Sequence, residues 1–168
     1  MTLPRALLAV AAALFCAVAA ADESPPIAVP KGSPRENAAR AYNDGVKLML
    51  DRRYAEAQRR FEDAIALDEK LAPAHNNLAF SLRMQGSANF ERAMGEYRRA
   101  LELDPKLAQA YMYRGVLHLQ MGNADAARAD LATLRGLDAP LAAKLEQVIA
   151  QQARDEREGL APQLEGVY

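Results

Sequence analysis

Hydrophobic and polar positions between residues 38 and 141 follow the same order three times. The stretches "FEDAIALDEKLAPAHNNLA" (61–79) and "YRRALELDPKLAQAYMYRG" (97–115) each describe the end of an amphipathic helix, a polar turn and the start of another helix. A helix–turn–helix unit that recurs at a fixed period predicts a repeat protein. The aligned units are residues 38–71, 72–107 and 108–141.

Small side chains recur at two positions of this unit. Two helices can approach closely only where a side chain is almost absent, so we expect these positions at the contact between paired helices. A large residue four positions after the second small one lies on the same helical face and fills the space beside that contact. The small residues are Gly45, Ala79 and Gly115 at the eighth position and Ala57, Ala93 and Ala127 at the twentieth; the large ones are Phe61, Tyr97 and Leu131.

The three units differ at their turns. Gly86 and Gly122 are expected to end the first helices of the second and third units in the left-handed conformation, where the first unit has Arg52. The second unit is two residues longer, because "GSANFERA" exceeds the turn seen in "GNADAA". We expect the extra pair to bulge into the turn, since an insertion within a helix would rotate its packing face.

After the third unit the sequence predicts one more helix, over residues 142–158. A repeat stack exposes the apolar side of its last unit, so a helix with one apolar and one polar face is expected to cap it. Asp138 is a suitable N-cap, with Pro140 in the first turn. Residues 159–168 are predicted to form a flexible tail. The apolar face consists of Leu141, Leu145, Val148, Ile149 and Gln152.

These units resemble the tetratricopeptide repeat, a helix–turn–helix unit of about 34 residues. The resemblance covers residues 38–141 and includes Asp104-Pro105 at the end of the second unit; Glu69 stands in the proline position of the first unit, and Pro140 comes one residue late in the third. The resemblance implies an all-α fold, a right-handed superhelical stack of three such units plus a C-terminal capping helix. It suggests a small exported bacterial-type member of the family.

The first 21 residues are of a different kind. Arg5 precedes an apolar run over residues 6–21, which ends in small residues before Asp22 and is typical of a cleaved signal peptide (1–21). An uncleaved membrane anchor is the alternative, but the run is shorter than the roughly 20 residues that span a bilayer. Residues 22–37 carry four prolines and no apolar period, so they predict an extended Pro-rich linker.

Cysteine content and net charge limit the cell compartments and the classes of partner that suit this protein. Cys16 is the only cysteine and lies within the predicted signal peptide, so the mature chain would have no thiol for a disulfide or for catalysis. We expect an exported protein without a membrane span after cleavage, periplasmic if its source is a Gram-negative bacterium. The net charge of −1 offers no basic surface for nucleic acid.

Little in the sequence favours catalysis. His75 and His118 stand at the fourth and eleventh positions of their units, which are packing positions, and two separated histidines are too few for a metal site. Acids and bases lie three or four residues apart, as on an exposed helix surface. The sequence has no phosphate loop, nucleophile elbow or paired cysteine ligands. We therefore predict a protein that is not an enzyme and needs no cofactor or metal.

In the resembling family the first helices line a concave groove. Asn76 and Asn77 could bond the peptide groups of an extended ligand, while Phe80, Met112 and Tyr113 could hold its side chains or a partner's amphipathic helix. For some groove positions packing within the stack is the alternative. The residues that the resemblance assigns to a peptide-binding groove are Tyr42, Asn43, Met49, Asn76, Asn77, Phe80, Arg83, Gln109, Met112 and Tyr113.

Some members of the family clamp a C-terminal carboxylate with a set of Lys, Asn and Arg side chains. Asn77 fits that set, but the other positions depart from it, so we do not expect this chain to capture a chain terminus. Arg83 alone remains to meet an acidic group. The departing positions hold Tyr42, Val46, Gln109 and Tyr113.

We therefore predict a non-catalytic adaptor that binds a peptide or helix of an envelope or periplasmic protein. The alternative is a self-associating or structural subunit of a larger envelope complex, because the outer side of the first helix, around residues 38–48, has no N-terminal cap.

Overall fold

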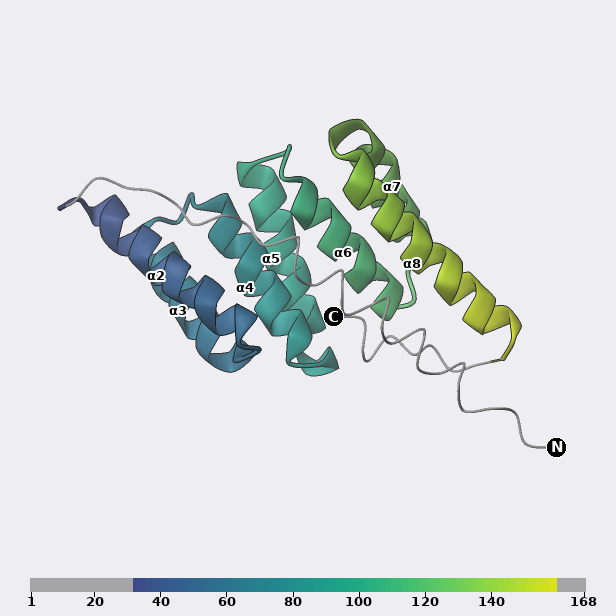
Figure 1. Cartoon of the computed structure of the whole chain (residues 1–168), viewed down its shortest axis with the longest axis horizontal. Coiled ribbons are helices and arrows are strands. Elements are labelled where there is room, and N and C mark those ends of the chain that lie inside the picture. Colours follow the sequence, from purple (N-terminus) through teal and green to yellow (C-terminus); the bar gives the residue numbers. More distant parts are fainter. Residues whose placement is uncertain (1–31, 160–168) are drawn as a thin grey trace.

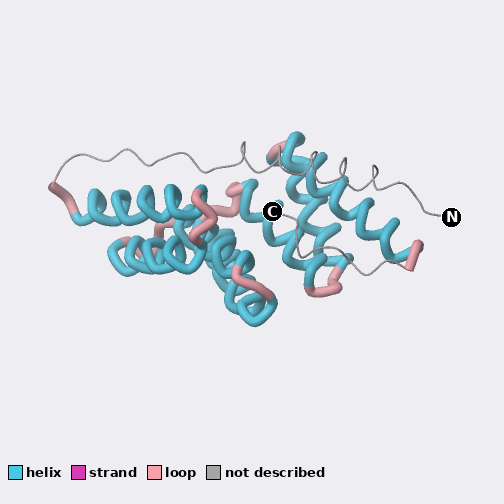
Figure 2. Tube along the Cα trace, turned by 60° about the horizontal axis from the view of Figure 1, so that its bottom comes forward, coloured by secondary structure: helices cyan, strands magenta, loops and turns pink. Residues whose placement is uncertain are grey.

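The computed structural model describes residues 32–159 of the 168-residue chain. That part is formed of α-helices joined by short turns, with no strand among its residues (Figures 1 and 2). The elements are α2 (Pro34–Leu50), α3 (Tyr54–Leu67), α4 (Ala72–Met84), the 3-10 turn η1 (Ser87–Asn89), α5 (Phe90–Leu103), α6 (Ala108–Gln120), α7 (Ala124–Leu137) and α8 (Ala139–Arg157).

The helices pair in chain order and the pairs stack. α2 packs on α3, α4 on α5 and α6 on α7, while α3 contacts α4 and α5 contacts α6 (Figure 1). The first helices also touch one another, α2 with α4 and α4 with α6, so they share one side of the stack. α8 packs on both α6 and α7, as a cap must. The predicted all-α stack of helix–turn–helix units with a C-terminal helix is confirmed.

The first helix pair closes around a glycine. A Cβ atom on Gly45 would lie 2.7 Å from a ring carbon of Phe61, well inside van der Waals contact. Phe61, Ala57 and Ala64 are all fully buried on the facing helix. The predicted match between the eighth and the twenty-fourth positions is therefore a direct contact in the first unit.

In the third unit the corresponding glycine has a different neighbour. A Cβ on Gly115 would meet Leu145 of α8, with its nearest methyl carbon at 2.6 Å, and not the residue at the twenty-fourth position, Leu131. Leu145 is fully buried. The glycine therefore makes room for the capping helix, which occupies the place where a further unit would pack.

The turns within the units follow the sequence pattern. Gly86 and Gly122 have positive φ, of 109° and 76°, and Arg52 in the first unit also has a positive φ, of 58°. The two extra residues of the second unit lie between α4 and α5, in the segment that contains the three-residue turn η1. The predicted bulge in this turn is confirmed, and both flanking helices keep their packing faces.

At each junction an aspartate side chain accepts a hydrogen bond from the backbone that follows it. Asp68 and Asp104 follow α3 and α5, and their carboxylates accept the backbone N–H groups of Lys70 and Lys106 at 3.1 and 3.0 Å. Asp138 accepts the N–H of Leu141 at 3.0 Å and so caps α8. Because of this cap α8 begins at Ala139, three residues before the predicted start at residue 142.

The predicted linker, residues 22–37, ends earlier than expected. α2 begins at Pro34, because the Ser33 hydroxyl accepts the N–H of Glu36 at 3.3 Å and proline fits the first helical turn. The predicted C-terminal bound of the linker was therefore wrong, because its last proline belongs to the first turn of α2. The predicted signal peptide (1–21), most of the linker and all but Gly159 of the predicted tail (159–168) lie outside the described residues. None of the helices in residues 32–159 is long and apolar enough to cross a membrane.

Replacing Gly45 by alanine should destabilise the fold. The new methyl group would overlap the buried Phe61 ring, and overpacking of this kind costs more than the helix propensity that alanine contributes. We expect the free energy of unfolding to fall by about 1–2 kcal/mol, measured by urea denaturation.

The matched control is Gly95→Ala on the exposed side of α5, where an added Cβ meets nothing within 4 Å. There the same substitution should raise stability by up to about 1 kcal/mol. Equal effects at the two glycines would contradict the packing argument.

Candidate functional site

Three aromatic rings from three helices form a continuous row on the side of the first helices. The ring centre of Phe80 in α4 lies 5.0 Å from that of Tyr113 in α6 and 6.2 Å from that of Tyr54 at the start of α3. Both contacts are edge-on, the preferred arrangement of aromatic pairs. All three residues are only partly buried. We call Tyr54, Phe80 and Tyr113 the aromatic row.

Arg83 stands one helical turn after Phe80. Its guanidinium carbon lies 5.2 Å from the centre of the Phe80 ring, and its Nη1 donates to Oε1 of Gln120 in α6 at 3.2 Å. Arg83 is only 4% exposed. Burial raises the pKa of the neighbouring Tyr97 phenol to about 12, an effect that the positive charge of Arg83 opposes.

A polar ladder connects α2 to α4 on the same side. Nδ2 of Asn77 donates to the Tyr42 hydroxyl at 3.2 Å, and Nδ2 of Asn76 donates to Oδ1 of Asn77 at 3.0 Å. Tyr42 also packs its ring 5.8 Å from the ring of Phe61. The ladder therefore joins the first unit to the second through buried side chains.

The structure divides the predicted groove residues into two sets. Partly exposed side chains are Asn43, Met49, Phe80, Gln109 and Tyr113. Buried ones are Tyr42, Asn76, Asn77, Arg83 and Met112.

Tyr42 and the two asparagines thus take part in the packing of the stack, because their positions face the neighbouring helix as well as the groove side. Contact of these ten residues with a ligand remains a prediction.

Sequence reasoning missed one member of the aromatic row. Tyr54 lies at the start of a second helix, α3, whereas the resemblance assigns the groove to the first helices. The structure shows that it reaches Phe80 of the next unit. The available signal was the aromatic residue at the start of the second helix in two units, Tyr54 and Phe90.

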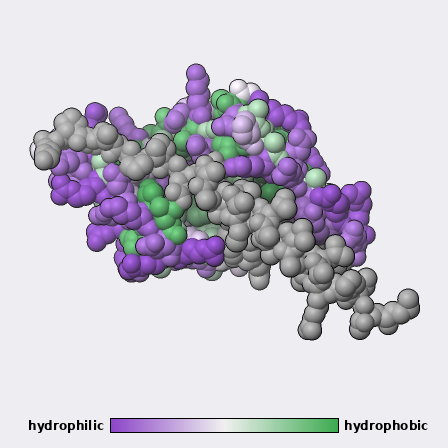
Figure 3. Space-filling model, viewed as in Figure 1, coloured by the Kyte–Doolittle hydropathy of each residue, from purple (hydrophilic) through white to green (hydrophobic). Residues whose placement is uncertain are grey.

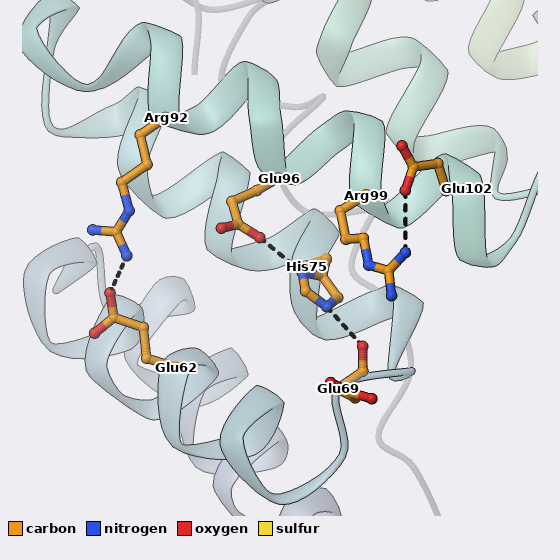
Figure 4. A network of polar contacts seen from close by, with 7 residues as sticks. All are labelled: Glu62, Glu69, His75, Arg92, Glu96, Arg99 and Glu102. Atoms are coloured by element: carbon orange, nitrogen blue, oxygen red, sulfur yellow. Dashed lines mark hydrogen bonds and ion pairs between the residues drawn. The ribbon is translucent and has the colours of Figure 1, made fainter.

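His75 holds two units together. Its Nδ1 lies 2.7 Å from Glu96 Oε2 in α5, and its Nε2 lies 3.1 Å from the carbonyl oxygen of Glu69 in the junction (Figure 4). Nearby, Arg92 of α5 pairs with Glu62 of α3 at 2.5 Å. These contacts give His75 a structural role in joining α4, α5 and the preceding turn.

His118 lies beside a buried ion pair in the third unit. Arg114 of α6 binds both carboxylate oxygens of Asp130 in α7, at 3.0 and 2.5 Å. Burial lowers the pKa of His118, whereas Asp130, 4.0 Å away, raises it and Arg114 lowers it again. Among residues 32–159 no group of three or more His, Cys, Asp or Glu side chains could hold a metal ion.

Hydrophobic side chains reach the surface between the hydrophilic faces of the helices. Figure 3 shows them as green patches among purple in the view of Figure 1. The large exposed ones lie at helix ends in both layers of the stack: Leu50 and Met121 at the ends of first helices, and Leu67 and Leu137 at the ends of second helices. What distinguishes the side of the first helices is the aromatic row with a buried cation beside it.

Comparison with known proteins agrees with this architecture. A family model described as TPR repeat matches residues 89–122, which cover α5 and α6. Among curated proteins, the photosystem I assembly protein Ycf3 of Synechococcus elongatus is 28% identical over 97 residues, 56% of this chain and 55% of that protein. Ycf3 of Acaryochloris marina is 29% identical over 90 residues, 53% of this chain and 54% of that protein. The chain thus spans about half the length of the curated relatives it matches.

Solved structures match over a larger share of the chain. The TPR domain of Arabidopsis OM64 superposes with a TM-score of 0.65 at 20% identity, over 71% of this chain and 98% of that domain. PcrH, in complex with the chaperone binding region of PopD, superposes with a TM-score of 0.65 at 22% identity, over 76% of this chain and 99% of PcrH. SycD of Yersinia enterocolitica, with a peptide of the translocator YopD, superposes with a TM-score of 0.61 at 14% identity, over 70% of this chain and 95% of SycD. These similarities show the fold.

Removing the Tyr42 hydroxyl should weaken the fold. Tyr42→Phe leaves the buried amide of Asn77 without its acceptor, which should lower the free energy of unfolding by about 1–2 kcal/mol. Tyr111→Phe is the control, because the Tyr111 hydroxyl bonds the Pro105 carbonyl at an exposed site where water can replace it. Thermal unfolding monitored by circular dichroism measures both, and an equal loss in the two variants would contradict a buried ladder.

Proposed function

We propose that this chain, which has the fold of tetratricopeptide repeat proteins, is a non-catalytic adaptor that holds a segment of a partner protein against its first helices. The observation that carries this proposal is the aromatic row. Three partly exposed rings, with Phe80 in contact with both tyrosines, offer an apolar surface at little cost in side-chain entropy. Such a surface suits the apolar side chains of a peptide or an amphipathic helix.

Proteins of similar fold support peptide binding as the class of activity. The second TPR of Spaghetti was solved bound to the HSP90 peptide SRMEEVD, and SycD was solved with a peptide of the translocator YopD. The curated relatives are named as assembly proteins. We extend from these only the general role, in which a short segment of another protein is held by the repeat stack.

The partner segment is proposed to be internal to its chain. A clamp for a terminal carboxylate would need several cations on the first helices, but the corresponding positions hold uncharged side chains. These positions are Tyr42, Val46, Gln109 and Tyr113.

We place this activity in an exported protein with a partner in the cell envelope. The support is the apolar leader of residues 1–21 with its small residues before Asp22, followed by a proline-rich stretch. The absence of cysteine after residue 16 suits an oxidising compartment, because no thiol is left to be oxidised.

A photo-crosslinker tests the binding face. Benzoylphenylalanine in place of Phe80 preserves an aromatic ring in the row, so the protein should fold and should crosslink a discrete partner in cells of the source organism. Mass spectrometry of the crosslinked band identifies the segment. The matched control places the same group at Arg98, an exposed position of α5. Equal yields of the same adducts from both positions would refute the proposed face.

Export has its own test. Expressed with its native N-terminus in a Gram-negative host, the protein should appear in the periplasmic fraction with a mass that begins at Asp22. Leu14→Arg puts a charge into the apolar run and should keep the protein uncleaved in the cytoplasm. Full-length protein retained in the membrane would favour the anchor instead.

A further inference from the structure

Arg83 is a buried cation for which residues 32–159 supply no anion. Its side chain takes part in none of the ion pairs formed within that range. Nη1 donates to the neutral amide of Gln120, and Nε has no hydrogen-bond partner. Buried arginine, in contrast, is normally paired with a carboxylate, and even the partly buried Arg114 is paired with Asp130.

The neighbours of Arg83 cannot replace a carboxylate. Tyr97 has a pKa of about 12, so its hydroxyl stays neutral at physiological pH. The Phe80 ring offers a cation–π contact, which is weaker than a paired charge. A guanidinium has five N–H donors in a planar fork that matches a carboxylate. The structure therefore holds a preorganised, partly unused donor beside the aromatic row.

We propose that Arg83 binds an Asp or Glu side chain of the partner segment while the aromatic row holds an apolar side chain of the same segment. This inference rests on the proposed function and gives the partner its chemistry. The carboxylate is assigned to a side chain because Arg83 is a lone cation among neutral neighbours, Phe80, Tyr97 and Gln120, whereas chain termini are held by several charged groups.

The spacing of the two subsites predicts a sequence signature. The Arg83 guanidinium carbon lies 5.2 Å from the centre of the Phe80 ring. In an extended segment side chains two positions apart point to the same face, at a separation of about 6.5–7 Å. The partner is therefore expected to carry an apolar residue and an acidic residue two positions apart.

A display library tests both parts. Random 12-residue segments, flanked on both sides by fixed linkers so that no free terminus is offered, are selected on the purified protein and on two variants. Wild type should enrich Asp or Glu two positions from an apolar residue. Arg83→Met should lose the acidic preference and keep the apolar one, while Phe80→Ala should lose the apolar preference.

One selected peptide then measures how much the acidic side chain contributes to affinity. Its acidic residue is replaced by the matching amide, and both peptides are titrated by fluorescence anisotropy. Wild type should bind the acidic peptide at least about tenfold more tightly, as expected of a charge-assisted hydrogen bond. Arg83→Met should bind both equally, and Arg83→Lys should recover part of the difference. Thermal unfolding of Arg83→Met should show no loss of stability, because the variant removes an unpaired buried charge.

The outcomes separate the two proposals. Segments that depend on Phe80 but show no acidic preference would overturn the role of Arg83 and leave the adaptor function standing. An acidic preference that persists unchanged in Arg83→Met would also overturn it. If no selected segment depends on Phe80, the proposed function itself fails, and the inference fails with it.

Discussion

The close approach of paired helices at residues without a side chain positions the rest of the stack. Gly45 lets the Phe61 ring lie against the backbone of α2, and Gly115 does the same for Leu145 against α6. With these contacts in place, α4 lies between α2 and α6, and its residues can reach both neighbours. Phe80 meets Tyr113 and Asn77 meets Tyr42 only because the first helices keep this register. The candidate site is thus a consequence of helix packing and not of any local motif.

Much of the fold can be predicted from the sequence, because small and large side chains recur at the positions where paired helices pack. The small and large positions identified the units, and the two extra residues of the second unit lie in the turn where an insertion does no harm. The partner of Gly115 could not be predicted in the same way. It belongs to α8, which is not part of the repeat, so no periodic signal connects the two residues. The start of α2 at Pro34 was not predicted either, because it depends on one capping residue, Ser33, in a stretch whose proline content indicated a linker.

The site was harder to predict than the fold. Family positions placed Phe80, Arg83 and Tyr113 in the groove, and their contact with a ligand remains a prediction. The same positions included Tyr42, which the structure buries against Phe61. Position within a repeat specifies a helical face, whereas burial depends on which neighbour that face meets. Tyr54 was missed because its contact with Phe80 crosses from one unit to the next. Contacts between units depend on the geometry of the stack and leave little trace in a single sequence.

Arg83 differs from the exposed charged residues of the stack, many of which pair within one helix in both layers, as Arg40 does with Glu36 in α2. On the outer helices Arg53 with Glu56, and Arg99 with Glu102, form exposed pairs within one helix that contribute little to stability. Arg83 is buried and has no anionic partner among residues 32–159, which costs stability unless a ligand compensates. Local loss of stability at a binding surface is a common sign of function. This contrast is the physical reason for assigning binding to the first helices.

Hydrogen–deuterium exchange of the protein, alone and with its crosslinked partner segment added as a peptide, tests that assignment most directly. We expect slower exchange in α4 and α6 and at the start of α3, with exchange in α5 and α7 unchanged. Protection confined to the exposed side of α5 and α7 would contradict it.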